Sequence, residues 1–356
     1  MIFSSAENRS ALFELHKEEC EHVIRKLVSL PAKSVKVELG GTGFSGAIIF
    51  RVALDDDLYA LRRWPSPTLP QQRILGLHRY LQHLKERNLP VAVPVSVPNS
   101  LPGRQCNRSL INFNGHYWQL EPWLPGEPKH GDEISDTELH EAMQTLARLH
   151  LASSDYVTSS SRNDWFSVKT AAPPTVQERI SLIDSWNCEK LQLCERAIET
   201  APSEIRDVCR SILNYFVQRA TPLRDSLCQK SNQVVTLFPC WRDLWSEHVL
   251  FTNDKVTGLI DPNATRCDHV ATDLSRLLGS YLGDDKRRWQ VALESYQEVR
   301  PLTELDHELI HLFDKTSVLL SGMTWIHRWQ SKAISADQFD KILDRLRLIK
   351  QRLQKL

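Results

Sequence analysis

The sequence lacks long apolar runs, and it carries no net charge. No stretch of about 18 consecutive apolar residues occurs in its 356 residues, and the first twenty contain no apolar segment of the secretory-signal type. Lysine plus arginine and aspartate plus glutamate both number 44, and no basic run stands out. We therefore expect neither a membrane nor a nucleic acid to be a partner of this protein.

The eight cysteines show no pairing pattern. None belongs to a C-x-x-C pair, which is the spacing typical of many zinc and redox sites. Without a secretory signal, the cysteines are predicted to be reduced thiols in a cytoplasmic protein, with no disulfide framework and no zinc site. Hydrophobic residues make up 41% and charged residues 25%, a composition that supports a globular protein with a sizeable core.

The periodicity of apolar residues changes along the chain and predicts an α+β fold with two lobes. The first part is predicted to contain helices at 11–30 and 69–87 and strands at 35–39, 47–54, 58–64, 109–113 and 116–123. The second part is predicted to contain helices at 135–152, 176–199, 203–219, 271–299, 303–330 and 336–356, and strands at 234–238, 249–251 and 256–260. The predicted lobes are a β-rich one over 1–124 and a mainly helical one over 125–356.

A glycine-rich segment lies between two of the predicted strands. Gly41, Gly43 and Gly46 form G-x-G-x-x-G in a chain that has only 13 glycines. In a dinucleotide-binding fold a helix follows this loop, but the next residues, 47–52, are β-rich. A glycine loop between two strands is the arrangement that covers nucleotide phosphates in kinases. An ordinary glycine-rich hairpin turn remains the alternative.

Two aspartates flank the predicted hairpin in the helical part. Asp243 lies on a loop before His248, and Asp261 follows the second strand after a turn at 253–255. This hairpin is expected to bring His248 and Asp261 side by side, with Asp243 facing the same space. Phosphoryl transfer needs one carboxylate to orient the attacking hydroxyl and another to hold a metal ion. The alternative is that both aspartates are turn or cap residues.

The segment around Asp243 resembles the aminoglycoside/choline phosphotransferase family, which has a protein-kinase-like fold. Residues 240–251 read CWRDLWSEHVLF, where the family usually has H-G-D-L-H-x-x-N-V-L, and Ile260–Asp261 matches the following I-D. The resemblance implies that Asp243 is catalytic and that His248 and Asp261 are metal ligands. Weaker matches are found at 121–126, at 146–150 and at 268–274, where Asp273 is expected to brace the loop.

The resemblance also implies the substrates and the cofactors. They are ATP or GTP, Mg²⁺ or Mn²⁺, and a small molecule with a hydroxyl group as the acceptor. The glycine loop and Arg62 would hold the phosphates, and the segment from Glu121 to Trp123 would hold the base through backbone groups. Neither the acceptor nor the oligomeric state can be identified from these motifs.

Four departures from the family pattern matter for the expected function. Arg62 stands where the third strand usually has a lysine, and no acidic residue occurs over 71–83 to pair with that cation. Trp241 replaces a histidine that usually has a packing role, and His248 replaces asparagine. An imidazole ligand would shift the metal preference from magnesium towards manganese. These departures keep open a non-catalytic, nucleotide-binding module and, less favoured, transfer of a nucleotide.

The tryptophans allow one further hypothesis about the acceptor. Aromatic faces attract cations, so tryptophans near Asp243 would suit an acceptor that carries an amine. The alternative is that they are core residues. The tryptophans concerned are Trp241, Trp245, Trp289, Trp325 and Trp329.

Overall fold

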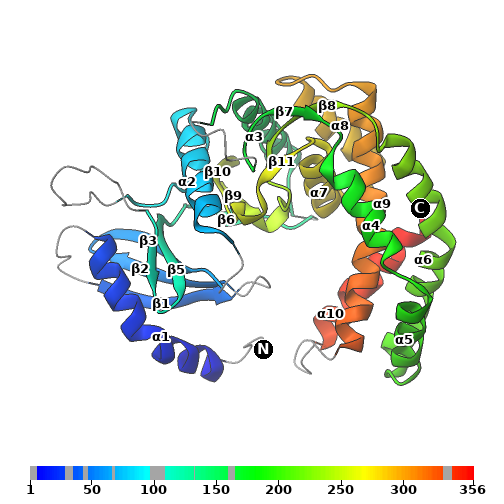
Figure 1. The fold of residues 1–356 in the computed structure, drawn as a ribbon, viewed down its shortest axis with the longest axis horizontal. Coiled ribbons are helices and arrows are strands. Elements are labelled where there is room, and N and C mark those ends of the chain that lie inside the picture. The colour runs from blue at the N-terminus through cyan, green and yellow to red at the C-terminus, as the bar shows by residue number, and fades with distance from the viewer. Residues whose placement is uncertain are drawn as a thin grey trace. The chain divides into compact units, whose positions relative to one another are not determined.

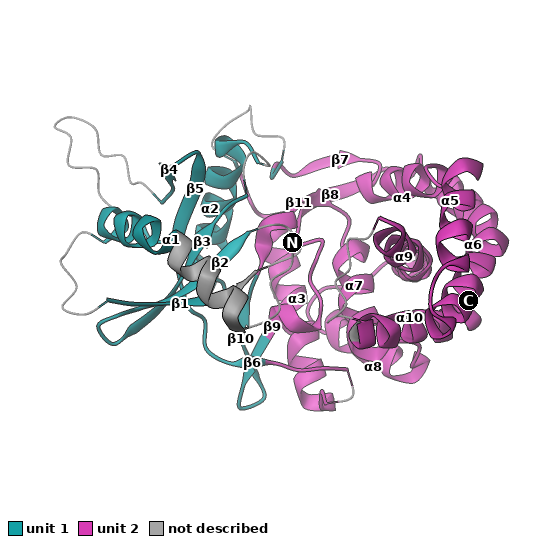
Figure 2. Cartoon of the chain, turned by 90° about the horizontal axis from the view of Figure 1, so that it is seen from below, with its two compact units in different colours: residues 1–127, 158–166, 250–260 teal, residues 128–157, 167–249, 261–356 magenta. Residues whose placement is uncertain are grey.

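The computed structural model describes residues 6–28, 35–42, 47–65, 69–96, 109–131, 133–158, 165–331 and 339–356 (Figure 1). The chain divides into two compact units (Figure 2). The first consists of residues 1–127, 158–166 and 250–260, and the second of residues 128–157, 167–249 and 261–356. Strands dominate the first unit and helices the second, which is the α+β composition that the sequence predicts.

The first unit is built on a five-stranded sheet with the order β1-β2-β3-β5-β4, in which neighbouring strands are antiparallel. The strands are β1 (Val35–Thr42), β2 (Ile48–Leu54), β3 (Asp57–Arg63), β4 (Ile111–Phe113) and β5 (His116–Pro122). They confirm the five strands that were expected in this part. Asn114 and Gly115 both have positive φ, at 48° and 74°, as a tight hairpin turn requires.

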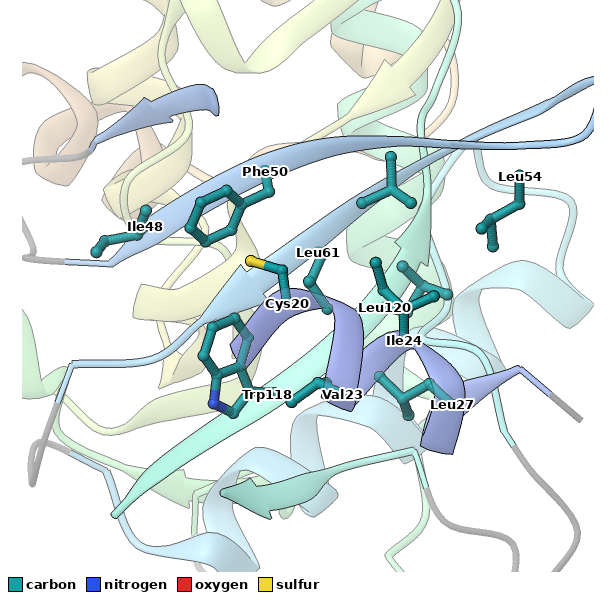
Figure 3. Packing of buried hydrophobic residues seen from close by; sticks show 11 residues of the cluster. Cys20, Val23, Ile24, Leu27, Ile48, Phe50, Leu54, Leu61, Trp118 and Leu120 are labelled. Atoms are coloured by element: carbon teal, nitrogen blue, oxygen red, sulfur yellow. The ribbon is translucent and has the colours of Figure 1, made fainter. Parts of the chain in front are cut away.

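Helix α1 (Ala6–Leu27) covers one face of this sheet (Figure 3). Cys20 and Val23 from the helix pack with Phe50, Leu61 and Trp118 from three strands, and all five side chains are buried. Because alternate residues of a strand point to opposite faces, Gln119, the neighbour of Trp118, faces the other side. There it meets His78 of helix α2 (Gln71–Glu86).

The second unit is a helical assembly in which α9 (Glu304–Gln330) packs against α4, α5, α6, α7 and α10. The other helices are α3 (Asp136–Ser154), α4 (Pro174–Asp184), α5 (Cys188–Glu199), α6 (Ser203–Lys230), α7 (Ala271–Leu282), α8 (Lys286–Gln297) and α10 (Phe339–Gln354). Gly322 lets α9 approach α6 closely, because a Cβ at this position would lie only 2.6 Å from a methyl carbon of Ile212.

Three of the predicted helices are broken or extended in the structure, and the helix expected over 11–30 runs over Ala6–Leu27. The helix expected over 176–199 is broken before Asn187, whose side chain caps α5. The one expected over 271–299 is broken at Gly283, and Asp285 caps α8. The one expected to end at residue 219 continues through Pro222, and Leu227 beyond the proline is fully buried. In the first two cases the apolar periodicity continues across a cap residue that starts a new helix. In the third, packing of residues beyond the proline extends the helix.

Two small strand groups lie near the predicted β interlude. Strands β7 (Lys169–Ala171), β8 (Val235–Cys240) and β11 (Arg266–Asp268) form an antiparallel sheet in the order β11-β8-β7. Strands β9 (Val249–Thr252) and β10 (Lys255–Leu259) form the expected hairpin, joined to the short β6 (Glu127–Pro128). The sequence analysis missed β6, β7 and β11, which are too short to show a period of two.

Two expectations about the whole chain can be compared with the structure. None of the described helices is long and apolar enough to cross a membrane. Seven of the cysteines are free thiols in the structure, and Cys106 lies outside the described residues.

Candidate active site

Asp243 lies on the loop at 241–248, between β8 and β9, and Asp273 of α7 fixes the start of this loop. The buried carboxylate of Asp273 accepts hydrogen bonds from the backbone N–H groups of Trp241, at 2.8 Å, and of Arg242, at 2.5 Å. Trp241 is fully buried, which agrees with a packing role at that position. The side chain of Asp243 is half exposed, so the loop presents this carboxylate to solvent.

Arg242 holds the turn of this loop in a left-handed conformation. Its φ is 68°, at the position where the family motif has glycine. Such a conformation costs a non-glycine residue about 1–2 kcal/mol. Nε of Arg242 lies 3.1 Å from the buried carboxylate of Asp268, and the guanidinium also binds Glu178. These ion pairs offset the backbone cost and keep Asp243 in place.

His248 is the last residue of a short 3₁₀ turn (Ser246–His248), directly before β9. Its Nδ1 lies 2.7 Å from the backbone carbonyl of Asp243, which can only accept, so Nδ1 carries the proton. Nε2 therefore has a lone pair, and the indole N–H of Trp245 donates to it at 3.0 Å. These two contacts indicate a neutral imidazole. Its one acceptor atom, Nε2, already accepts a hydrogen bond.

Asp261 follows β10 in the left-handed conformation, with φ 55°. Its Oδ2 lies 3.9 Å from Nε2 of His248, which confirms that the hairpin brings these two side chains together. Asn263, which the sequence analysis did not single out, donates its side-chain N–H to Oδ1 of Asp261. A carboxylate and a side-chain amide oxygen are ligands that Mg²⁺ and Mn²⁺ accept.

The side chains at Asp261 can bind a divalent cation, but only one of the two predicted ligands is directly available. The carboxylate is partly exposed, at 39%, and is therefore accessible to an ion. His248 can join as a ligand only if Trp245 gives up its hydrogen bond to Nε2. The residues that would hold the cation are thus Asp261 first, with Asn263 and His248 as further candidates.

A second group of ligand-type side chains is structural. Atoms of His150, Cys240 and Asp273 lie within 4.8 Å of one another, and all three residues are buried. His150 is hydrogen-bonded to the Tyr296 hydroxyl at 2.7 Å and to Asp273 at 3.2 Å. Burial raises the pKa of the Cys240 thiol well above its usual range, whereas a metal ligand must be a thiolate. Through Asp273 this group braces the loop at 241–248.

The sequence analysis also missed Arg276 on α7, which is the direct partner of Asp243. Its Nε and one terminal nitrogen both lie 3.1 Å from Oδ1 of Asp243. The other carboxylate oxygen, Oδ2, makes no hydrogen bond with a described residue. The Arg276 guanidinium also lies 5.7 Å from the centre of the Trp245 ring. Arg276 lies 33 positions after Asp243, so no local motif could connect them.

In the first unit, Arg62 pairs with an acid that the sequence analysis had assigned another role. The side chain of Glu121, expected to hold a base through its backbone, lies 3.5 Å from the Arg62 guanidinium, and both are buried. Glu121 also accepts a hydrogen bond from Gln119 at 2.7 Å. No acidic residue of α2 is needed, because the partner comes from β5. Arg63 points to the opposite face and lies 3.7 Å from Glu19 of α1, as strand alternation predicted.

The remaining predicted nucleotide contacts are partly described. Gly41 lies in β1, paired with Ile49 of β2, so a strand stands on each side of the glycine segment. This arrangement contradicts the dinucleotide-binding alternative. Gly43 and Gly46 lie outside the described residues. The backbone N–H of Trp123 donates to the Leu58 carbonyl at 2.9 Å, so this donor is engaged within the sheet.

Comparison with known proteins gives a consistent family. Residues 40–308 match the sequence profile of the phosphotransferase enzyme family. A homoserine kinase of Rhizobium johnstonii is 26% identical over 265 residues, covering 72% of this chain and 68% of that protein. A homoserine kinase of Rhodospirillum rubrum is 24% identical over 270 residues, with the same coverage.

Solved structures show the same fold. An amicoumacin kinase, in complex with AMP-PNP and Ca²⁺, has a TM-score of 0.64 at 14% identity and covers 96% of each chain. A microcompartment-associated aminopropanol kinase has a TM-score of 0.61 at 14% identity, over 95% of this chain and 97% of that one. A profile match over well over half of the chain, together with this two-part protein-kinase-like fold, shows that the protein belongs to the phosphotransferase enzyme family.

Proposed function

We propose that this small-molecule kinase moves the γ-phosphate of ATP or GTP to a hydroxyl group, with Asp243 as the residue that orients and deprotonates that hydroxyl. In this reaction the bond between the γ-phosphorus and the bridging oxygen of the nucleotide breaks. A bond from the acceptor oxygen to phosphorus forms, and the hydroxyl proton passes to Asp243. Homoserine, the substrate named for the similar kinases, is one candidate acceptor.

The observation that carries this proposal is the state of the Asp243 carboxylate. Arg276 binds Oδ1, which fixes the carboxylate, while Oδ2 is left without a hydrogen bond from a described residue. A fixed carboxylate with one accepting oxygen is what a general base for a hydroxyl needs. Arg276 acts here as a positioning residue.

Arg62 is proposed to bind the phosphates, with the glycine segment around Gly41. A guanidinium keeps the positive charge of the usual lysine and can bind two phosphate oxygens at once. Glu121 would orient Arg62, as the glutamate of a helix does in many kinases. Because Glu121 and Arg62 lie on neighbouring strands of one sheet, this pair does not depend on the position of α2.

The family uses a nucleoside triphosphate with a divalent metal ion, and we propose Asp261 as its principal ligand in this chain. A cation there supplies positive charge to the phosphate oxygens during transfer. The carboxylate of Asp261 would bind it directly, while Asn263 holds this carboxylate in position. We further propose a cytoplasmic location, where such nucleotides are abundant.

The rival proposal is a nucleotide-binding module without catalysis, and one experiment separates the two. Purified protein is incubated with ATP or GTP, Mg²⁺ or Mn²⁺, and a panel of amino alcohols, sugars and hydroxy amino acids that includes homoserine. The phosphorylated product and the nucleoside diphosphate are both measured. Nucleotide binding without turnover on any acceptor would favour the module.

A further inference from the structure

A small pocket of about 210 Å³ lies in the second unit, and one of its lining residues contacts Asp243. Trp245 and Arg276 line it, and Arg276 contacts the carboxylate of Asp243. Resting on the proposed function, we infer that this pocket binds the acceptor and that the acceptor carries a carboxylate, which Arg345 and Arg276 bind. The acceptor would then be a small hydroxy acid, a hydroxy amino acid included.

Three arginines line the pocket, and they differ in whether their guanidinium groups already have an acidic partner. Arg352 is bound to Asp314 at 2.8 Å. Arg276 directs two of its nitrogens to Asp243. Arg345, on α10, makes no hydrogen bond or ion pair with a described residue. It is the lining guanidinium whose donors are available to a bound anion.

The electrostatics around Arg345 favour an anion as well. Arg345 is exposed, but partial desolvation and repulsion from Arg276 still lower the pKa of its guanidinium, and the carboxylate of Glu247, which also lines the pocket, opposes both effects. The other titratable groups that line the pocket are His130 and Asp314, and Asp314 is already bound to Arg352. Two guanidiniums that repel each other across a pocket are both stabilised by a carboxylate placed between them.

Three of the five serines that line the pocket use their hydroxyls within the fold. Ser280 accepts from the backbone N–H of Ser246 and donates to a carbonyl of its own helix. Ser275 donates to a helix carbonyl, and Ser317 accepts from Arg179. Since these hydroxyls are engaged in the fold, the arginines are the stronger recognition elements.

Of the five tryptophans considered for an amine, only Trp245 lines this pocket. Trp241 and Trp289 are buried. The ring of Trp245 lines the pocket, but the cation near this ring is the guanidinium of Arg276. In this pocket the ring of Trp245 already has a cationic neighbour, so we propose that the charge recognised there is negative.

The size of the pocket limits the acceptor. Pockets for drug-sized ligands measure about 300–1,000 Å³, so 210 Å³ suits a molecule of amino-acid size. A carboxylate at Arg345 and a hydroxyl at Asp243 would be joined by a short carbon chain. The phosphate would be transferred to that hydroxyl, and the carboxylate would stay unchanged.

The test compares acids with their neutral analogues. Short hydroxy acids, with and without a 2-amino group, are offered as acceptors beside their primary amides, which are close in shape but lack the charge. We expect the acids to be used at least about tenfold more efficiently, as kcat/KM. Arg345→Gln should raise KM for the acid about 10- to 100-fold, change kcat little, and leave the amide unaffected. Arg345→Lys should recover part of the loss.

Arg347→Gln is the matched control, because Arg347 is an exposed arginine on the same helix that does not line the pocket. Equal use of acids and amides, or equal effects of Arg345→Gln and Arg347→Gln, would overturn the inference. Calorimetry with the acids alone, without nucleotide, tests the carboxylate site separately from the proposed phosphotransferase function. Binding of an acid that depends on Arg345, without phosphate transfer, supports the carboxylate site and contradicts the phosphotransferase role. Phosphate transfer to amides without binding of any acid would support the phosphotransferase role and contradict the carboxylate site.

Discussion

Nδ1 of His248 lies 2.7 Å from the backbone carbonyl of Asp243, so the proposed metal-site histidine supports the loop that carries the proposed base. The same imidazole accepts a hydrogen bond from Trp245 at Nε2 and lies 3.9 Å from Asp261. One side chain therefore connects the two ends of the β9–β10 hairpin. A change at His248 should consequently affect both the loop geometry and any bound metal.

Asp243→Asn should lower kcat by about 10³-fold or more, because an amide cannot take the hydroxyl proton. Nucleotide affinity and thermal unfolding should be nearly unchanged, since the carboxylate is half exposed and the loop is held by Asp273. Turnover assays and calorimetry measure these quantities. Asp254→Asn, at an exposed hairpin turn, is the matched control. Full activity of the Asp243 variant, or its global unfolding, would show that Asp243 is structural.

Trp245→Phe should increase the use of Mn²⁺ relative to Mg²⁺. This change removes the indole N–H and frees the Nε2 lone pair of His248, which is a softer ligand than oxygen. His248→Asn should shift the preference towards Mg²⁺. Activity is measured as a function of the concentration of each metal ion. If wild type and both variants share one metal preference, His248 is not a ligand.

Arg62→Ala should weaken ATP binding by about 10- to 100-fold, because it removes a charge-assisted contact to phosphate. Glu121→Gln should weaken binding less, since Arg62 keeps its charge but loses an orienting partner. Arg63→Ala is the matched control, because Arg63 faces α1 and pairs with Glu19. Calorimetric titration with a non-hydrolysable ATP analogue gives the affinities. A larger effect of Arg63→Ala would mean that the phosphate is not bound on the Arg62 face.

Acidification should destabilise the first unit through His78. Burial lowers the pKa of His78 to about 4 from an ordinary value of 6.5. Between these values the unfolded chain binds the proton more readily, so the stabilisation is complete above pH 6.5 and is lost as the pH falls towards 4. The loss amounts to at most about 3 kcal/mol.

His78→Gln should flatten this dependence in urea unfolding between pH 6.5 and 4. Glutamine can still bond to Ser109 and Gln119, the two partners of His78, but does not titrate. His83→Gln, on the same helix, should retain the wild-type slope. Parallel pH profiles of wild type and His78→Gln would show that another group is responsible.

The sequence by itself determined most of the order of elements and singled out the segment around Asp243 that we propose to be catalytic. Apolar periodicity and tight-turn residues act locally, which is why the β1–β3 strands and the hairpin at Asn114–Gly115 were predicted well. The proximity of His248 and Asp261 depends on a single hairpin, so it could also be anticipated. The breaks near Asn187 and Gly283 were missed because cap residues inside a long apolar pattern were given too little weight.

Only the tertiary structure decided which groups surround these residues. Arg276 reaches Asp243 from α7, and Glu121 reaches Arg62 from β5. Arg345 comes to the acceptor pocket from the last helix. Ion pairs and hydrogen bonds between distant segments depend on how helices and strands pack, and packing leaves no periodic trace in the sequence. Local patterns therefore predict most of the elements, whereas the charges that we propose to recognise the acceptor come together only through long-range contacts.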